Sequence, residues 1–314
     1  MQTRKARSRW SRTGKLMKEN IGLYGLILLP LAYVIIFQYL PMYGIVIAFK
    51  NFKPAKGILG SSWVGLYHFQ RFINTARFTR ILKNTIFLSL YSLFAEFPIP
   101  VLLAVLLNSC TNKPLKKVTQ TVTYAPHFIS TVVFVGMLNV FFAPSTGIVK
   151  QIMTKIGLMN AADNLGVLTS EAAFKHLYVW SGVWQGMGWG SIIYLAALSG
   201  VDPTLHEAAR VDGANKIQRI WHIDIPAIVP TIVTMFIIRC GSILGVGFEK
   251  VYLMQNSLNG NAAEVISTYV YKVGLLDAQY SYSAAIGLAN NIVNLIMLLT
   301  VDRIAKSLGQ NGLF

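Results

Sequence analysis

The stretch that decides the fold is DPTLHEAARVDGANKIQRIWHIDIP, residues 202–226, which lies between two apolar segments that are each long enough to cross a bilayer. Asp202 is a good helix N-cap with Pro203 ready for the first helical turn, and Thr204 with Glu207 also fits a capping box. Gly213 is typical of a helix stop. The pattern predicts a short helix inside a polar loop, starting in either of two frames.

The composition of this short helix favours contact with another protein. Glu207, Ala208 and Ala209 place one charge beside two methyl-sized side chains. Small side chains let a helix backbone lie deep in a groove of a partner, while Glu207 meets a cation at the rim. An ordinary hairpin explains the helix caps but not the whole pattern, so we expect the loop to be a docking element.

The whole chain has the composition of a membrane protein. Hydrophobic residues make up 54% of its 314 residues, charged residues 13%, and the mean hydropathy is +0.51. A span needs about 20 mostly apolar residues to cross a hydrocarbon core about 30 Å thick. Six segments meet this requirement, at 21–40, 84–107, 124–142, 176–198, 227–248 and 284–301. We therefore predict an all-α, polytopic membrane protein with six transmembrane helices and both termini on one side.

Charge predicts which side that is. The first 20 residues hold seven basic residues and a single acid, Glu19. By the positive-inside rule the N-terminus, the C-terminus and the loop 202–226 are cytoplasmic. A signal peptide also begins with basic residues, but the first apolar run is long and has no small-residue cleavage pattern before Pro41.

These spans divide the chain into five parts. We predict a basic cytoplasmic tail at 1–20, a first transmembrane helix at 21–40 and an external loop with an interfacial segment at 41–83. A main transmembrane domain at 84–302, which contains the loop 202–226, and a cytoplasmic tail at 303–314 follow. The external loop holds seven Lys and Arg and no acid. This charge runs against the positive-inside rule, and the length and interfacial path of the loop account for it.

Several kinds of function are disfavoured. A net charge of +16 attracts phosphate, but many of the basic residues lie in the predicted tail and cytoplasmic loops, where anionic lipid explains them, so we predict no nucleic-acid partner. Cys110 and Cys240 lack metal-ligand spacing, and we expect both to be unpaired. The sequence has neither a metal-ligand cluster nor a phosphate-binding Gly-rich loop. We therefore predict no catalytic residue, no metal and no cofactor on this chain.

The spacing of the loop resembles a known family. Glu207, Ala208 and Ala209 are followed at fixed intervals by Gly213, Ile223 and Pro226, as in the EAA loop of the permease subunits of binding-protein-dependent, type I ABC importers. Ile225 departs from the Leu that is usual there. The resemblance implies that the loop couples the permease to an ATPase, through Glu207, Ala208, Ala209, Asp212, Gly213, Ile223 and Pro226.

Further segments resemble the polysaccharide-type branch of the carbohydrate permeases, relatives of the maltose transporter permeases. They are QYLPMYGIVIAFK at 38–50, APHFIS at 125–130, GWGSIIYLAAL at 188–198 and EVISTYVYKVGL at 264–275. Glu96 departs from that family, where a small or apolar residue is expected. The resemblance implies ATP-driven import of a sugar or oligosaccharide, and the basic external loop weakly favours an acidic one.

The resemblance also implies an assembly in the cell membrane. Its other members are a second homologous permease subunit, two ATPase subunits that hold ATP and Mg²⁺, and an extracellular or periplasmic sugar-binding protein. Alternating access driven by the ATPases is the expected mechanism. Other readings remain open, namely an ABC permease for peptides or polyamines, a membrane enzyme and a passive channel.

Polar residues inside the predicted spans are candidates for the substrate passage. On the fifth span Arg239, Ser242, Val246 and Glu249 fall within an arc of about 80° at 100° per residue, and this shared face either carries a structural ion pair or lines the sugar path. Gln185 on the fourth span, and Asn290 and Asn294 on one face of the sixth, are further candidates, although hydrogen bonding between helices also explains the asparagines. Pro98 and Pro100 are expected to kink the second span.

Overall fold

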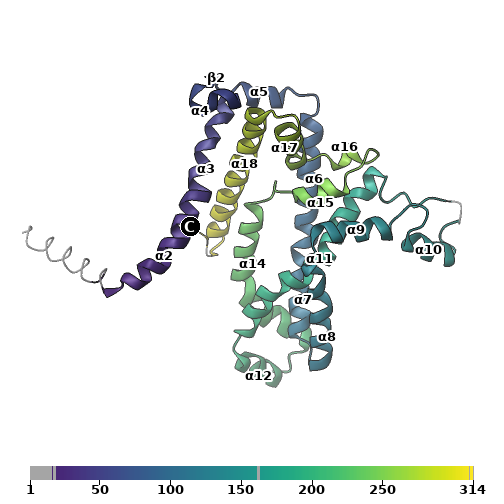
Figure 1. Cartoon of the computed structure of the whole chain (residues 1–314). Helices are drawn as coiled ribbons and strands as arrows, with labels where there is room; N and C mark the ends of the chain where they lie inside the picture. The colour runs from purple at the N-terminus through teal and green to yellow at the C-terminus, as the bar shows by residue number, and fades with distance from the viewer. Residues whose placement is uncertain (1–15, 17–18, 161–162, 311, 314) are drawn as a thin grey trace, which may run out of the picture.

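The computed structural model describes residue 16 and residues 19–160, 163–310 and 312–313. Most of the predicted basic tail, residues 1–15 and 17–18, therefore lies outside the described residues. The described chain is mostly helical, with one short antiparallel pair of strands. Long helices run roughly side by side, with α12 at one end of the molecule and α4 and α5 at the opposite end (Figure 1).

The N-terminal part is one long helical run followed by short elements. It contains α2 (Ile21–Val34), a π-helical turn (Ile35–Tyr39), α3 (Leu40–Met42) and a 3-10 helix (Tyr43–Phe49). After it come β1 (Lys50–Asn51), a 3-10 turn (Pro54–Lys56), α4 (Gly57–Gly60), β2 (Ser62–Trp63) and α5 (Tyr67–Ile73). The helical run continues to Phe49, beyond the residue 40 where the predicted first span ends, because Pro41 stands at the start of α3 and does not break the run.

The rest of the chain forms the bundle. Its first half contains α6 (Phe78–Glu96), α7 (Pro98–Asn108), α8 (Lys113–Tyr124), a 3-10 turn (Ala125–Phe128), α9 (Thr131–Phe141), α10 (Ile148–Lys155) and α11 (Glu171–Ser199). Its second half contains α12 (Pro203–Val211), α13 (Lys216–Arg219), a π-helical turn (Ile220–Asp224), α14 (Ile225–Cys240), α15 (Phe248–Met254), α16 (Gly260–Ala263), α17 (Ile266–Tyr271), a second such turn (Lys272–Leu276) and α18 (Tyr280–Ser307).

Four helical runs of the described chain are long and apolar enough to cross a membrane, and a bent pair raises this number to five. The four are Ile21–Phe49, Phe78–Asn108, Lys216–Cys240 and Tyr280–Ser307. Helix α11 has 29 residues, so it is about 43 Å long, but it is less apolar than these four. Each of the six predicted segments overlaps one of these runs, the bent pair or α11.

The third predicted span, 124–142, is not one straight helix. The run Lys113–Phe128 and helix α9 meet at an angle of 102°. Helix α9 has 11 residues, about 16 Å, which is too short to cross a bilayer alone. The bend lies where Ile129 and Ser130 take extended backbone conformations and the Ser130 hydroxyl caps α9.

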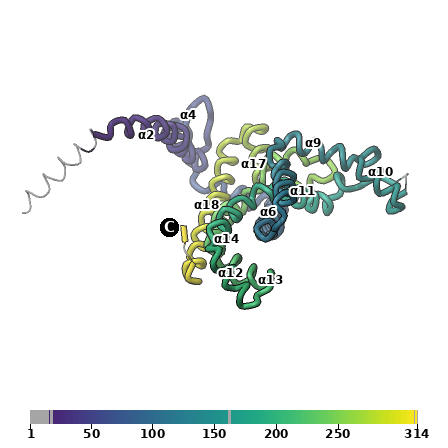
Figure 2. Tube along the Cα trace, turned by 90° about the horizontal axis from the view of Figure 1, so that it is seen from below, coloured from purple at the N-terminus to yellow at the C-terminus, as the bar shows by residue number. Residues whose placement is uncertain are grey.

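The core of the bundle surrounds α11. This helix packs against α6, α7, α8, α14 and α16, and Phe174 and Val179 on it are fully or almost fully buried. The run of α6 and α7 is interrupted at Phe97, directly before Pro98, where the prolines were predicted to disturb it. By contrast, α2 extends away from the bundle on the opposite side from α10 (Figure 2). No residue of α2 is buried, which suits a helix surrounded by lipid or by a partner.

Candidate functional site

The loop 202–226 begins with a capped helix. The Asp202 carboxylate accepts a hydrogen bond from the Thr204 backbone N–H at 2.9 Å, and Pro203 stands in the first turn of α12. Of the two predicted frames, the helix uses the one that starts at Asp202. The bond from Thr204 holds the pKa of Asp202 below its usual value, so this carboxylate is charged at neutral pH and faces the positive end of the helix dipole.

Helix α12 ends in a Schellman motif centred on Gly213. Gly213 has a φ of +80°, its N–H donates to the Arg210 carbonyl at 3.1 Å, and the Ala214 N–H donates to the Ala209 carbonyl at 2.8 Å. A residue with a side chain rarely adopts this backbone conformation. Gly213 therefore ends the helix as predicted and turns the chain towards α13, whose start is fixed by a capping box between Asn215 and Gln218.

Most of the surface of α12 is exposed, and only His206 and Ala209 on this helix are partly buried. No residue of α12 is buried, and Val211 at its end is 88% exposed. The apolar side chains of Leu205, Ile217 and Trp221 nearby are also more than half exposed. Glu207 forms one weak ion pair, with Arg210 at 4.0 Å. The loop projects from one end of the bundle (Figure 1). A polar loop that exposes such apolar residues has the properties of a docking surface.

A hollow lies between α12 and the next helix. It measures about 320 Å³, and four of the predicted coupling residues line it, namely Ala209, Asp212, Gly213 and Ile223. Pro226 does not line this hollow, since it stands in the first turn of α14 and is exposed. The helical run that contains Ile223 starts at Lys216 and not at 227, the predicted start of the fifth span. Ile223 therefore belongs to the helical run that borders this hollow together with residues of α12.

A buried carboxylate ties this loop to the bundle. Asp224 is 3% exposed, and its Oδ1 lies 3.3 Å from His206 Nε2 on α12 and 3.3 Å from the Asn108 amide nitrogen at the end of α7. One side chain, at the entrance to α14, thus joins α12 to the end of α7. Sequence reasoning missed Asp224, and its signal was an acid placed among the apolar residues Ile223 and Ile225.

The second region of interest lies where the predicted fifth span breaks. Helix α14 ends at Cys240, and residues 241–244 form turns and 245–247 an irregular segment before α15 begins at Phe248. The prediction that Arg239, Ser242, Val246 and Glu249 share one helix face is therefore wrong. Gly241, Gly245 and Gly247 disfavour a helix here, so the helical spacing does not apply beyond Cys240.

Arg239 has a different partner from the predicted one. Its guanidinium contacts the Glu96 carboxylate at the end of α6, and not Glu249. Glu249 is exposed in the first turn of α15. The proposed pair of Arg239 with Glu249 is thus replaced by a pair between two helices whose residues are distant in sequence. Glu96, which departs from the expected apolar residue, supplies the acid.

Two cavities meet at this pair. One of about 250 Å³ lies towards Ser89, Ser92 and Tyr178, and the other, of about 750 Å³, lies along Gly186, Gly190 and α14. Glu96, Arg239 and Ser242 line both cavities. Among the described residues, Glu96 and Arg239 are the only charged side chains in either lining.

The other predicted passage residues lie elsewhere. Gln185 donates a hydrogen bond to the Ile129 carbonyl at 3.1 Å, and Asn294 accepts one from the Leu244 N–H at 3.1 Å. The Asn290 side-chain oxygen is buried without a hydrogen-bond partner in the described structure, beside a separate apolar cavity of about 530 Å³. Gln185, Glu249, Asn290 and Asn294 line neither of the two cavities at Glu96.

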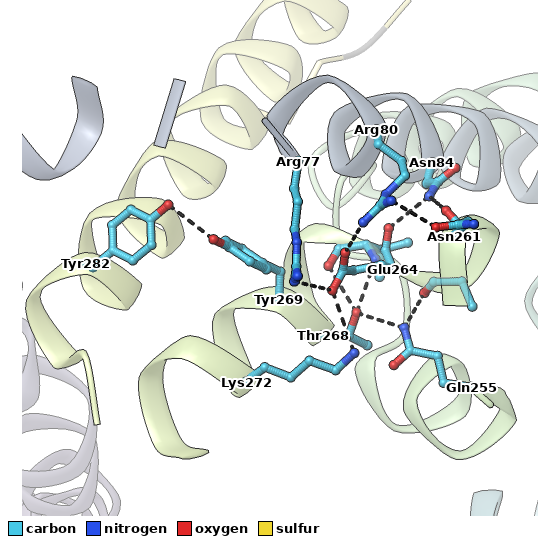
Figure 3. Close-up of polar contacts among 12 residues, drawn as sticks. Arg77, Arg80, Asn84, Gln255, Asn261, Glu264, Thr268, Tyr269, Lys272 and Tyr282 are labelled. Atoms are coloured by element: carbon cyan, nitrogen blue, oxygen red, sulfur yellow. Dashed lines mark hydrogen bonds and ion pairs between the residues drawn. The ribbon is translucent and has the colours of Figure 1, made fainter. Parts of the chain in front are cut away.

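A third cluster surrounds Glu264, at the end of the bundle opposite α12 (Figures 1 and 3). This 6% exposed acid faces three partly exposed cations, Arg80 at 3.0 Å, Lys272 at 3.7 Å and Arg77 at 3.8 Å. The Asn84 amide also donates to the Glu264 backbone carbonyl at 3.1 Å. The cluster joins α6 to α17 and leaves an excess of positive charge at this end.

Comparison with known proteins identifies the family. Residues 96–310 match the family described as binding-protein-dependent transport system inner membrane component. The chain belongs to this family. It is accordingly a membrane protein and a transport permease subunit, not an enzyme, and it works with a binding protein.

Named relatives of this permease extend the match to most of the chain. It is 42% identical to the polygalacturonan/rhamnogalacturonan transport system permease protein YteP of Bacillus subtilis (strain 168), over 96% of this chain and 92% of that one. It is 30% identical to the arabinooligosaccharides transport system permease protein AraP of the same organism, over 88% of this chain and 85% of AraP.

Solved structures share the fold of this permease. A chain of a bacterial alginate ABC transporter, solved in complex with an alginate pentasaccharide-bound periplasmic protein, superposes with a TM-score of 0.87 at 38% identity. The match covers 95% of this permease and 99% of that chain. The predicted permease fold is therefore confirmed.

Proposed function

We propose that this permease imports acidic oligosaccharides that contain uronate units. The observation that carries the proposal is the similarity, over 95% of the chain or more, to a polygalacturonan/rhamnogalacturonan permease and to an alginate transporter, because polygalacturonan and alginate are polyuronates. The charge of the chain agrees with this substrate class. Residues 41–83 hold seven basic residues and no acid, and cations outnumber acids around Glu264. Such a surface attracts anions.

The permease acts within a larger assembly. It pairs with a second homologous permease subunit, and two ATPase subunits hold ATP and Mg²⁺, so this chain binds no cofactor. An extracellular or periplasmic binding protein delivers the saccharide. The exposed surface of α12 supports docking on an ATPase, with Glu207, Ala208 and Ala209 in contact and Asp212, Gly213, Ile223 and Pro226 shaping the loop.

The orientation of the permease follows from the same assignment. An ATPase is cytoplasmic, so the end of the bundle that carries α12 faces the cytoplasm, and both termini lie on that side. The end that carries α5 and the Glu264 cluster then faces the binding protein (Figure 1). The excess of cations there attracts an acidic saccharide to the entrance.

The contacts suggest how the cycle works. ATP binding closes the ATPase subunits and moves α12, and the bonds from His206 to Asp224 and from Asn108 to Asp224 pass the motion to α14 and α7. Arg239 stands at the far end of α14, and Glu96 ends α6 two residues before α7 begins; both line the two cavities. Alternating access follows if this motion opens the cavities first outward and then inward.

The substrate class is testable with the complete transporter in liposomes. The initial rate of ATP-driven uptake is measured for a galacturonate trisaccharide and for the neutral trisaccharide maltotriose, each with the cognate binding protein. The proposal predicts uptake of the uronate and little uptake of maltotriose. Uptake of maltotriose alone, or of neither sugar, would contradict it.

A further inference from the structure

The strongest unexplained feature is an imbalance of charge beside the two cavities. Arg239 is 49% exposed even though it contacts Glu96, so part of its guanidinium faces open space. An arginine can hold two carboxylates at once or exchange one for another, because its five N–H donors form a planar fork.

Glu96 has a second cation on its other side. A Cβ atom placed on Gly182 would lie 2.5 Å from Glu96 Oε1 and 3.2 Å from Lys250 Nζ, so these two groups border the same small space. A side chain at position 182 would collide with the Glu96 carboxylate in this position and crowd the Lys250 ammonium, so this arrangement needs glycine there. The Glu96 carboxylate therefore lies between Arg239, which its Oε2 contacts, and Lys250.

Lys250 is held in place and kept away from the passage. Its ammonium donates to the Tyr178 carbonyl at 2.8 Å and lies over the rings of Tyr178 and Phe134, at 4.8 and 5.3 Å from their centroids. It lines neither cavity, whereas Arg239 lines both. Of the two cations around Glu96, one faces substrate space and the other is fixed behind it.

We propose that Arg239 is a binding site for a carboxylate of the substrate and that Glu96 occupies it while the passage is empty. When a uronate reaches the cavity, its carboxylate replaces Glu96 as the ion-pair partner of Arg239. Glu96 then pairs with Lys250. Arg239 and Lys250 are two cations that face one carboxylate, Glu96. The carboxylate of the substrate therefore brings the net charge of the cluster to zero. No buried acid loses its partner in this exchange, which keeps the cost of releasing Arg239 low. This inference rests on the proposed function.

The exchange makes Arg239 a selectivity residue. In the complete transporter, uptake is measured for a galacturonate trisaccharide and for its methyl ester, which has the same size but no charge. The quantity of interest is the ratio of acid uptake to ester uptake. The binding protein is the same in every assay, so its own preference cancels when variants are compared with the original protein.

Arg239→Gln is expected to lower this ratio about tenfold or more, because it removes charge-assisted hydrogen bonds to the acid alone. The variant leaves Lys250 beside Glu96 as a neighbouring cation, so normal assembly with the partner subunits is expected. Arg239→Lys, which keeps the charge but loses the fork, is expected to give an intermediate ratio and serves as a second variant if Arg239→Gln assembles poorly. Arg303→Gln, at an exposed position on α18, is the matched control and should keep the original ratio.

Glu96→Gln tests the other half of the exchange. With the internal competitor removed, KM for the acid is expected to fall about threefold or more, while KM for the ester stays the same. An unchanged ratio in assembled Arg239→Gln and Arg239→Lys, or an unchanged KM for the acid in Glu96→Gln, would overturn the inference. If the original transporter fails to import the acid at all, the proposed function itself falls, which is a different result from these.

Discussion

The geometry of Gly213 allows a sharp test of the coupling loop. Gly213 has a φ of +80°, and a Cβ atom added to it would meet nothing within 4 Å. Gly213→Ala therefore costs only the backbone strain of a left-handed conformation, about 1–2 kcal/mol, with no steric clash. That energy corresponds to a loss of about 5- to 30-fold in the population of the loop conformation seen here.

The expected result is that ATP-driven uptake and the apparent affinity of the permease for its ATPase subunit fall by about the same factor. The reason is that the ATPase binds only the loop conformation seen here. The assay is saccharide uptake into liposomes, with the amount of co-purifying ATPase measured at several concentrations. Gly213→Asn, which tolerates the left-handed region better, should keep most of the activity. Gly136→Ala on α9, where a Cβ atom also meets nothing and φ is ordinary, is the matched control. Full uptake and ATPase affinity in Gly213→Ala would refute the reasoning.

Three further predictions address the same account. Glu207→Lys should abolish coupled uptake but change the stability of the permease by less than about 0.5 kcal/mol, because its ion pair with Arg210 is long and exposed; thermal unfolding and uptake measure the two effects. Asp224→Ala should slow uptake and destabilise the loop by about 1.5–3 kcal/mol, since the bonds from His206 and Asn108 are lost, and unchanged proteolysis of the loop would argue against this. A reporter inserted between residues 210 and 220 should be cytoplasmic and one near Gly60 external, and the opposite labelling would reverse the orientation.

The coupling loop could be predicted from sequence because its signals are local. Asp202, Pro203 and Gly213 determine where a short helix starts and ends within a few residues, and the structure has that helix. The choice between its two starting frames could not be predicted, because Asp202 and Thr204 are both acceptable caps. The hydrogen bond from the Thr204 N–H to the Asp202 carboxylate decides the frame, and it is visible only in the structure.

The centre of the bundle was less predictable. A continuous fifth span was expected from hydropathy, although Gly241, Gly245 and Gly247 carried the signal of a break. The contact of Arg239 with Glu96 joins residues far apart in sequence, so it depends on how α6 and α14 pack. An unusual acid could be noticed from sequence, but its partners could not be named.

Asn290, Asn294 and Gln185 illustrate the same limit. Their positions on helices were correctly expected. Helix periodicity shows which residues share a face of a helix, but it does not show which groups pack against that face. The structure places Gln185 against the Ile129 carbonyl and Asn294 against the Leu244 amide, so both are occupied by backbone groups of the bundle.

The central claim is that this chain couples an ATPase to uphill movement of a saccharide. The most direct measurement is accumulation of a labelled galacturonate trisaccharide inside liposomes that hold the complete transporter, with its binding protein outside and its ATPase subunits facing the interior. The account predicts that the internal concentration rises above the external one only when ATP and Mg²⁺ are inside and the binding protein is present. Equilibration of the trisaccharide without ATP would contradict it and indicate a passive channel.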